Sequence, residues 1–386
     1  MRRFVLLLVT LGALYWAWRG FGEGDPARAA DSELVGGSGT VPLEGLRLVD
    51  GPRSGPESAG GAPGAADDAA SALRRRDAEA LRSGYRRLLE ASGESRARLA
   101  AALQEAAGTD AATALDALGD GNAFLHSPEG RTAAQRAVAM ASAEAPEVAV
   151  KTFTRLLELA MRGRIEVGDV DARAAVDSIL AAYRSPLNRV AFNPEHLAGA
   201  RSHRVAPGEV LEKIARSYRS QGINLDPLTL ALFNRIDDPT KVRAGQMLKV
   251  PVEPIRTVVE KRSFLMAMYV GDAIFRLYWV GHGKDDRTPE TQFVVSTKNF
   301  EPTWYIDGRA IPYGHPDNIL GKYFVKFEHA SLQGYGAHGT PAQETIGTMA
   351  SRGCIRMRDG DIEEFFKVVP RGSVVDIRST VLPGSR

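Results

Sequence analysis

The chain has a single cysteine, Cys354, and the residues around it are the first candidates for chemistry. Cys354 follows Gly353 in the stretch SRGCIRM, residues 351–357, and His338 lies sixteen positions upstream. A free thiol with a pKa of about 8.5 is only a few per cent thiolate at neutral pH, whereas an adjacent imidazolium can lower that pKa to roughly 3.5–7.5. These residue types permit acyl transfer, with Cys354 as the nucleophile and His338 as the general base.

Acyl transfer also needs hydrogen-bond donors for the oxyanion of the tetrahedral intermediate. Gly353 lets the backbone come close to a substrate, so the N–H groups of Gly353 and Cys354 are the predicted oxyanion hole. On spacing alone an alternative stays open: Cys354 can be a buried core residue beside Ile355 and Met357, and His338 a histidine with a structural role.

Composition narrows the class of protein. The formal net charge is +2 at pH 7 and no basic block dominates, so nucleic-acid binding is not predicted. The other histidines of the C-terminal part show no metal-ligand spacing, so neither a metal nor a cofactor is expected there; they are His282, His315 and His329.

Residues 1–19 indicate export. Arginines precede an apolar run over Phe4–Trp18, and Arg19 ends it. The run is short for a transmembrane helix, which needs about 20 apolar residues, and suits a signal peptide. Trp16 and Trp18 also suit an interfacial anchor. We therefore expect a protein of the periplasm or cell envelope, released by cleavage or held at the inner membrane by an uncleaved anchor.

Two segments separate this N-terminus from the rest. Residues 20–66 are rich in Gly, Pro, Ser and Ala, which predicts a flexible linker. Residues 67–198 carry apolar side chains at helical spacing, for example Phe153, Leu156, Leu157 and Ala160. This pattern predicts an α-helical bundle and leaves its role open.

Residues 201–252 read as strand, helix, helix and strand. This segment resembles the lysin motif, a small βααβ domain that binds N-acetylglucosamine-containing glycans. The matching residues are Val205, Gly208, Leu211, Ile214, Ala215, Tyr218, Asn234, Gly245, Gln246, Leu248 and Pro251. The sequence departs from the usual motif at Glu209 and Val210, where aspartate and a small hydroxyl residue are common.

Residues 254–380 alternate in strand fashion, and only the segment 360–369 predicts a helix. The chain as a whole is predicted to be a multidomain α+β protein. It would comprise an N-terminal helical bundle, a small lysin motif and a C-terminal mainly-β domain that holds Cys354.

The motifs around Cys354 resemble the L,D-transpeptidase family. They are HGT at 338–340, IG at 346–347, SRGCIRM at 351–357 and the segment GHGKDDRTPETQF at 281–293. The resemblance implies a peptidoglycan enzyme that releases D-alanine from a tetrapeptide stem through a cysteine thioester. An amine of a second stem then takes the acyl group, which forms a 3→3 cross-link. Peptidoglycan would be the partner of both the catalytic domain and the lysin motif.

The resemblance also assigns residues. It implies that Cys354 is the nucleophile, that His338 is the base, and that the backbone carbonyl of Gly339 orients the imidazole. Substrate contacts are expected from Ser351, Arg352 and Arg356. Arg352 is a departure, because many family members have a second histidine there.

Other outcomes remain open at this stage. Water could resolve the thioester, which would make an L,D-carboxypeptidase, or a free D-amino acid could exchange into the stem. A non-catalytic wall-binding scaffold is the alternative from another class. Papain-like wall endopeptidases place the cysteine before the histidine, and sortases space the two much farther apart, so both are excluded.

Overall fold

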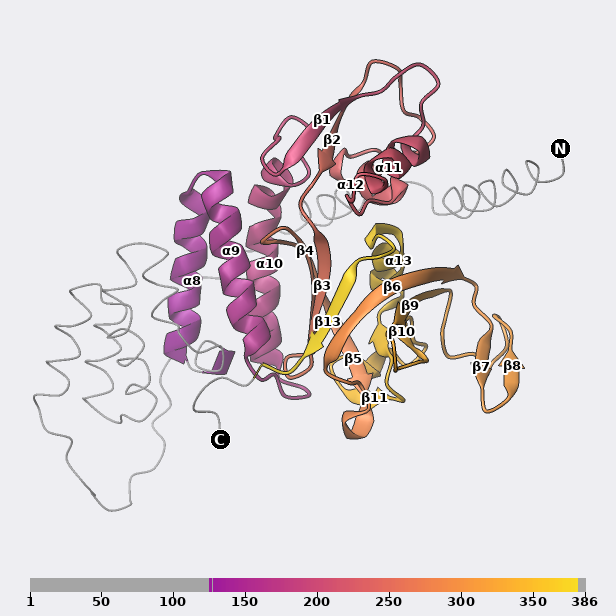
Figure 1. The fold of residues 1–386 in the computed structure, drawn as a ribbon. Coiled ribbons are helices and arrows are strands. Elements are labelled where there is room, and N and C mark those ends of the chain that lie inside the picture. Colours follow the sequence, from indigo (N-terminus) through magenta and orange to yellow (C-terminus); the bar gives the residue numbers. More distant parts are fainter. Residues whose placement is uncertain (1–124, 127, 381–386) are drawn as a thin grey trace, which may run out of the picture. The chain divides into compact units, whose positions relative to one another are not determined.

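A computed structural model of the chain describes residues 125, 126 and 128–380 (Figure 1). The predicted signal or anchor, the predicted linker and residues 67–124 of the predicted bundle lie outside these residues. The described helical part consists of α8 (Pro128–Ala143), α9 (Pro146–Arg162) and α10 (Val170–Val190). Pro146 suits the first turn of α9, and Asp169 caps α10 by accepting the N–H of Ala172.

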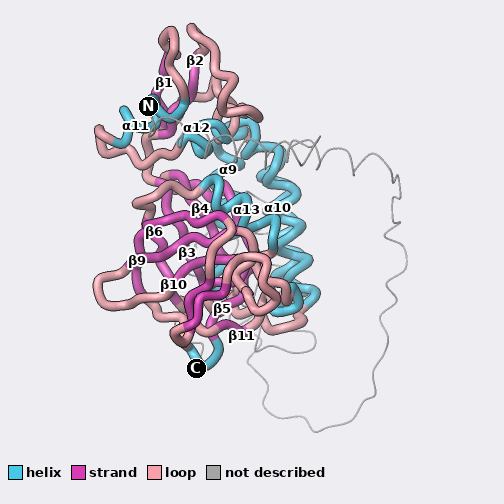
Figure 2. The backbone as a smooth tube through the Cα atoms, turned by 90° about the vertical axis from the view of Figure 1, so that its right-hand side faces the viewer, coloured by secondary structure: helices cyan, strands magenta, loops and turns pink. Residues whose placement is uncertain are grey.

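These helices share one hydrophobic core with the C-terminal domain. The apolar stripe predicted on α9 is buried, and α10 adds Val176, Ile179 and Tyr183 to the same core. The Tyr183 hydroxyl donates to the carbonyl of Ile274 at 2.7 Å, and Trp279 Nε1 donates to Asp177 at 3.1 Å. Figure 2 shows the helices running beside the strands. The described helices therefore help to complete the core of the C-terminal domain.

The segment that resembles the lysin motif consists of β1 (Ala200–Arg204), α11 (Leu211–Arg219), α12 (Pro227–Phe233) and β2 (Met247–Pro251). Strands β1 and β2 pair antiparallel, and the motif has a small core of its own. Glu209, which replaces the usual aspartate, accepts the N–H of Ala206 at 2.9 Å. Val210 occupies the N-cap of α11, where it makes no side-chain cap bond. Glu209 thus closes the turn before α11 although Val210 cannot cap the helix.

The C-terminal domain is a nine-stranded sheet in the order β11-β5-β12-β10-β9-β6-β13-β3-β4. Its strands are β3 (Ile255–Glu260), β4 (Leu265–Val270), β5 (Ala273–Gly283), β6 (Thr291–Phe300), β9 (Tyr323–Glu328), β10 (Tyr335–His338), β11 (Met349–Ser351), β12 (Ile355–Met357) and β13 (Val374–Arg378). Strand β4 also pairs with β5, which closes the sheet into a barrel.

Four shorter elements complete the domain: the 3₁₀ turns η1 (Lys284–Asp286) and η2 (Gln343–Thr345), the hairpin β7 (Trp304–Ile306) and β8 (Arg309–Ile311), and helix α13 (Asp359–Val368). The hairpin turns through Asp307 and Gly308, both with positive φ, which is the backbone of a tight β-hairpin. The predicted mainly-β domain with one helix near its end is present.

Candidate active site

The site is built on two neighbouring strands. Strands β10 and β12 run parallel, with Ala337 opposite Ile355 and His338 opposite Arg356. Ala337 and Ile355 are buried in the core, and side chains alternate along a strand, so His338 and Arg356 share the other face. Cys354 directly precedes β12. Neighbouring strands lie about 4.8 Å apart, so the end of β10 and the start of β12 bring His338 and Cys354 to the same region of the sheet.

His338 is held in one orientation. The residue is 3% exposed, and its Nδ1 lies 2.5 Å from the carbonyl oxygen of Gly339, the contact that the family resemblance implies. A carbonyl only accepts, so Nδ1 carries the proton and Nε2 keeps its lone pair in the neutral ring. Burial lowers the pKa of His338 to about 4, although the hydrogen bond to Gly339 raises it. The charge of Arg356 lowers the pKa further. This pKa leaves the ring neutral at pH 7.

Cys354 is half-buried, and its thiol donates to the carbonyl of Gly334 at 3.4 Å. Burial raises the pKa of Cys354 to about 11, while a backbone hydrogen bond from Gly336 and the charge of Arg356 oppose the shift. These pKa directions favour a neutral thiol and a neutral imidazole over a thiolate and an imidazolium. The physical reason is burial, which disfavours the charged form of both groups.

The turn before Cys354 is closed by Ser351. Its hydroxyl accepts the N–H of Gly353 at 3.0 Å and donates to the carbonyl of Cys354 at 2.6 Å. Ser351 is 2% exposed, so the structure uses its hydroxyl inside the turn. The N–H of Gly353, predicted as an oxyanion donor, is engaged by this bond.

The two arginines predicted to contact the substrate lie in different environments. The side chain of Arg352 is 65% exposed and pairs with Asp307 at the tip of the β7–β8 hairpin, at 3.4 Å. Arg356 is half-buried, and its Nη1 donates to the hydroxyl of Thr345 at 3.2 Å. Its buried Nε has no hydrogen-bond partner among the described residues. Arg356 therefore offers a donor beside the thiol, and Arg352 faces solvent.

Sequence reasoning assigned no role to Thr288. Its side chain is buried, and its hydroxyl donates to the carbonyl of Gly353 at 2.8 Å. The available signal was the Thr-Pro pair at 288–289 inside the segment that resembles the family. A contact between residues 65 positions apart cannot be read from that pair alone.

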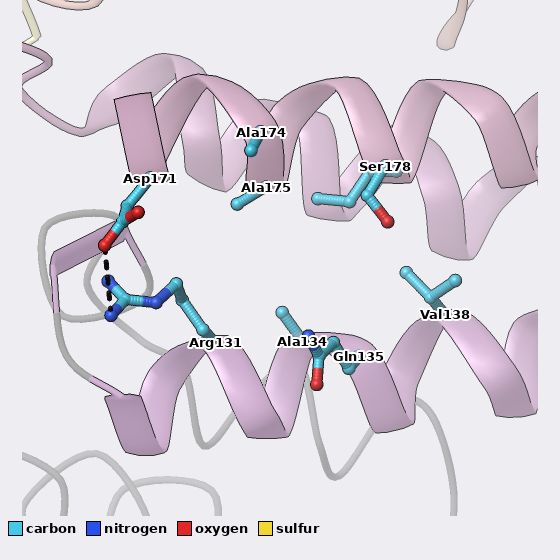
Figure 3. Close-up of a pocket in the computed structure, with 9 residues that line it drawn as sticks. Arg131, Ala134, Gln135, Val138, Asp171, Ala174, Ala175 and Ser178 are labelled. Atoms are coloured by element: carbon cyan, nitrogen blue, oxygen red, sulfur yellow. Dashed lines mark ion pairs between the residues drawn. The ribbon is translucent and has the colours of Figure 1, made fainter. Parts of the chain in front are cut away.

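Two further features do not bear on the site. An open pocket of about 270 Å³ lies between α8 and α10, lined mainly by small side chains, with the Arg131–Asp171 ion pair at one end (Figure 3). None of the predicted site residues lines it. Across residues 125–126 and 128–380, no group of His, Cys, Asp or Glu could hold a metal ion, and no helix is long and apolar enough to cross a membrane.

The family models match both resemblances. The model of the L,D-transpeptidase catalytic domain matches residues 254–377, and the LysM domain model matches residues 203–251. Among solved structures, an L,D-transpeptidase from Mycobacterium smegmatis aligns over 35% of this chain and 64% of that chain, at 19% identity and a TM-score of 0.27.

Curated proteins of similar sequence point to the same family. The putative L,D-transpeptidase YqjB of Bacillus subtilis is 36% identical over 129 residues, which are 33% of this chain and 72% of that protein. The putative L,D-transpeptidase YkuD of Bacillus licheniformis is 31% identical over 182 residues, which are 45% of this chain and 97% of that protein. The chain therefore belongs to the L,D-transpeptidase family.

Proposed function

We propose that this peptidoglycan L,D-transpeptidase uses Cys354 as its nucleophile and His338 as its general base. The observation that supports the proposal is the parallel pairing of β10, which ends at His338, with β12, which begins directly after Cys354. The carbonyl of Gly339 fixes the tautomer that leaves Nε2 free to accept a proton.

The first half-reaction is acylation. Cys354 Sγ attacks the carbonyl carbon of the third residue of a tetrapeptide stem, and His338 takes the thiol proton. The tetrahedral intermediate collapses, the bond to D-alanine breaks, and His338 returns the proton to the leaving amine. D-Alanine departs and a thioester on Cys354 remains.

The second half-reaction is transfer. An amine of a second stem attacks the thioester carbonyl and loses its proton through His338 to the departing sulfur. The product is a 3→3 cross-link and the thiol is restored. Arg356, whose buried Nε lacks a partner in the described part of the chain, is suited to bind an acceptor atom of the stem peptide.

Location and targeting belong to the same proposal. Both domains point to peptidoglycan, so the chain must reach the cell envelope. We assign that step to residues 1–19, as a cleaved signal peptide or as an uncleaved anchor in the inner membrane. Membrane fractionation with a C-terminal tag distinguishes the two, because an uncleaved anchor keeps the tag in the membrane fraction.

The test uses purified protein and tetrapeptide stems. Cys354→Ala should abolish D-alanine release, because no sulfur remains to form the thioester. His338→Gln should reduce the release strongly while leaving a thiol that reagents can still modify. Unchanged D-alanine release by Cys354→Ala would show that the nucleophile is wrong. The products separate the outcomes: a 3→3 dimer shows transpeptidation, a tripeptide shows carboxypeptidation, and a stem carrying a new D-amino acid shows exchange.

A further inference from the structure

Three backbone segments meet behind the turn that carries Cys354. They are the end of β5, the loop at 284–288 and the turn at 351–354. A Cβ at Gly283 would lie 2.8 Å from the nitrogen of Thr288 and 3.0 Å from the Cα of Gly353. The close approach requires glycine at 283, and it brings the Thr288 side chain against the catalytic turn.

The peptide between Gly353 and Cys354 is poorly constrained by its own residues. Gly353 has a φ of +138°, a conformation that residues with a Cβ rarely adopt. Such a Cβ would also lie 3.0 Å from the carbonyl of Arg287 and from the ring of Tyr335. Glycine permits either orientation of the following peptide, so neighbouring hydrogen bonds must select one.

Thr288 makes the hydrogen bonds that select one orientation of this peptide. Its hydroxyl accepts the N–H of Gly283 and donates to the carbonyl of Gly353, both at 2.8 Å, and the residue is 0% exposed. Both hydrogen-bonding directions of the hydroxyl are used by fixed backbone groups. The carbonyl of Gly353 is therefore held toward Thr288.

Fixing that carbonyl also fixes a donor. In a trans peptide the C=O and the following N–H point in opposite directions, so the N–H of Cys354 points away from Thr288. The N–H of Gly353 is already bonded to Ser351 at 3.0 Å. Of the two backbone donors predicted for the oxyanion, only that of Cys354 is oriented through Thr288.

We infer that Thr288 is a positioning residue that orients the Gly353–Cys354 peptide so that the Cys354 N–H, rather than the Gly353 N–H, stabilises the oxyanion. This inference rests on the proposed function of Cys354 as the nucleophile. The hydroxyl of Thr288 is engaged by the backbone of Gly283 and Gly353, so Thr288 acts through the peptide it holds.

The first test compares Thr288→Val, which keeps the shape and removes the hydroxyl, with Thr288→Ser, which keeps the hydroxyl. The valine variant should lower kcat for D-alanine release by at least about tenfold, toward the roughly 10²–10³-fold cost of losing one oxyanion donor, with KM within about threefold. The serine variant should restore kcat to within about threefold. Thr257→Val is the matched control, because Thr257 is also 0% exposed and its hydroxyl has no hydrogen-bond partner among the described residues.

A second readout separates this role from general damage. Iodoacetamide alkylates a thiol by displacement at a saturated carbon, so no oxyanion forms. Alkylation of Cys354 should proceed in Thr288→Val at close to the wild-type rate, while D-alanine release falls. Equal losses in both reactions, or a wild-type kcat in a folded valine variant, would overturn the inference. Failure of the proposed function is a different result, namely D-alanine release by Cys354→Ala.

A measurement on the wild-type protein does not depend on the variant folding. A stem-peptide aldehyde adds the Cys354 sulfur to its carbonyl carbon, and the thiol proton passes to His338 or to the oxygen. In a crystal structure of this adduct the oxygen should accept the N–H of Cys354, with the Thr288–Gly353 bond kept. An oxygen bonded to the N–H of Gly353, or one placed away from both N–H groups, would contradict the inference.

Discussion

Lys298 of β6 and Asp226 of the lysin motif form an ion pair of 2.9 Å in which each side chain is only 7% exposed. Lys298 also donates to the carbonyl of Val369 at 3.0 Å, and Thr229 of α12 donates to the carbonyl of Val368 at 2.7 Å. Phe233 of the motif packs against Phe275 of β5 with ring centroids 5.4 Å apart. The lysin motif is therefore part of a buried interface with the catalytic domain.

Asp226→Leu should destabilise the protein by about 3–5 kcal/mol, because it leaves the ammonium of Lys298 buried without its counter-charge. The double variant Asp226→Leu, Lys298→Met should recover most of this loss, since both charges are gone. Urea denaturation measures the free energy of unfolding. Arg309→Met is the control: its ion pair with Asp317 is exposed, and such pairs contribute roughly 0–1 kcal/mol. Equal losses of unfolding free energy in Asp226→Leu and Arg309→Met would show that the Asp226–Lys298 contact does not stabilise the interface.

The sequence predicted the strands around the candidate site because their signals are local. The HGT and SRGCIRM motifs bracket the candidate site. The strand that ends at His338 is paired with the strand that begins directly after Cys354. Spacing and local pattern were sufficient for these features.

The other features of the site and the fold depend on tertiary contacts. The pKa directions of Cys354 and His338 follow from burial by segments distant in sequence, which no local pattern encodes. The same holds for the bond from Thr288 to Gly353 and for the Lys298–Asp226 pair. The helical pattern of residues 67–198 predicted helices but could not show that α10 reaches the barrel through Tyr183.

Arg352→Ala should change kcat/KM by less than about fivefold. The guanidinium is 65% exposed, and its 3.4 Å pair with Asp307 is of the solvent-exposed kind that contributes roughly 0–1 kcal/mol. Steady-state kinetics on tetrapeptide stems provide the measurement, with Asp307→Ala and the double variant completing a cycle. A loss above a hundredfold in Arg352→Ala, unmatched by Asp307→Ala, would instead place Arg352 in direct contact with the substrate.

Arg356→Gln should raise the pKa of both Cys354 and His338. Burial is the main cause of each shift, raising the pKa of the thiol and lowering that of the imidazole, and the charge of Arg356 lowers both. Thiolate absorbance near 240 nm and the imidazole resonances report the two groups. Lys213→Gln removes the same charge from an exposed position on α11 and should move neither pKa. A shift of the two values in opposite directions would contradict a charge effect from Arg356.

The pH profile tests the neutral thiol–imidazole pair. With the pKa of His338 lowered to about 4 and that of Cys354 raised to about 11, the base is neutral and the thiol protonated across the neutral range. As the pH increases, kcat/KM should rise around the His338 pKa of about 4, where the imidazole loses its proton. It should then stay constant from about pH 5 to 9. His338→Gln should lack that rise.

Alkylation by iodoacetamide completes this test, because the chain has no other cysteine and every modified thiol is Cys354. Only the thiolate reacts, so the rate should keep rising with pH toward the raised pKa of about 11. A preformed thiolate–imidazolium pair would behave differently: alkylation would already be at its plateau at neutral pH, and protonation of the thiolate would lower the rate in acid. Such a plateau would show that burial does not control the protonation of Cys354.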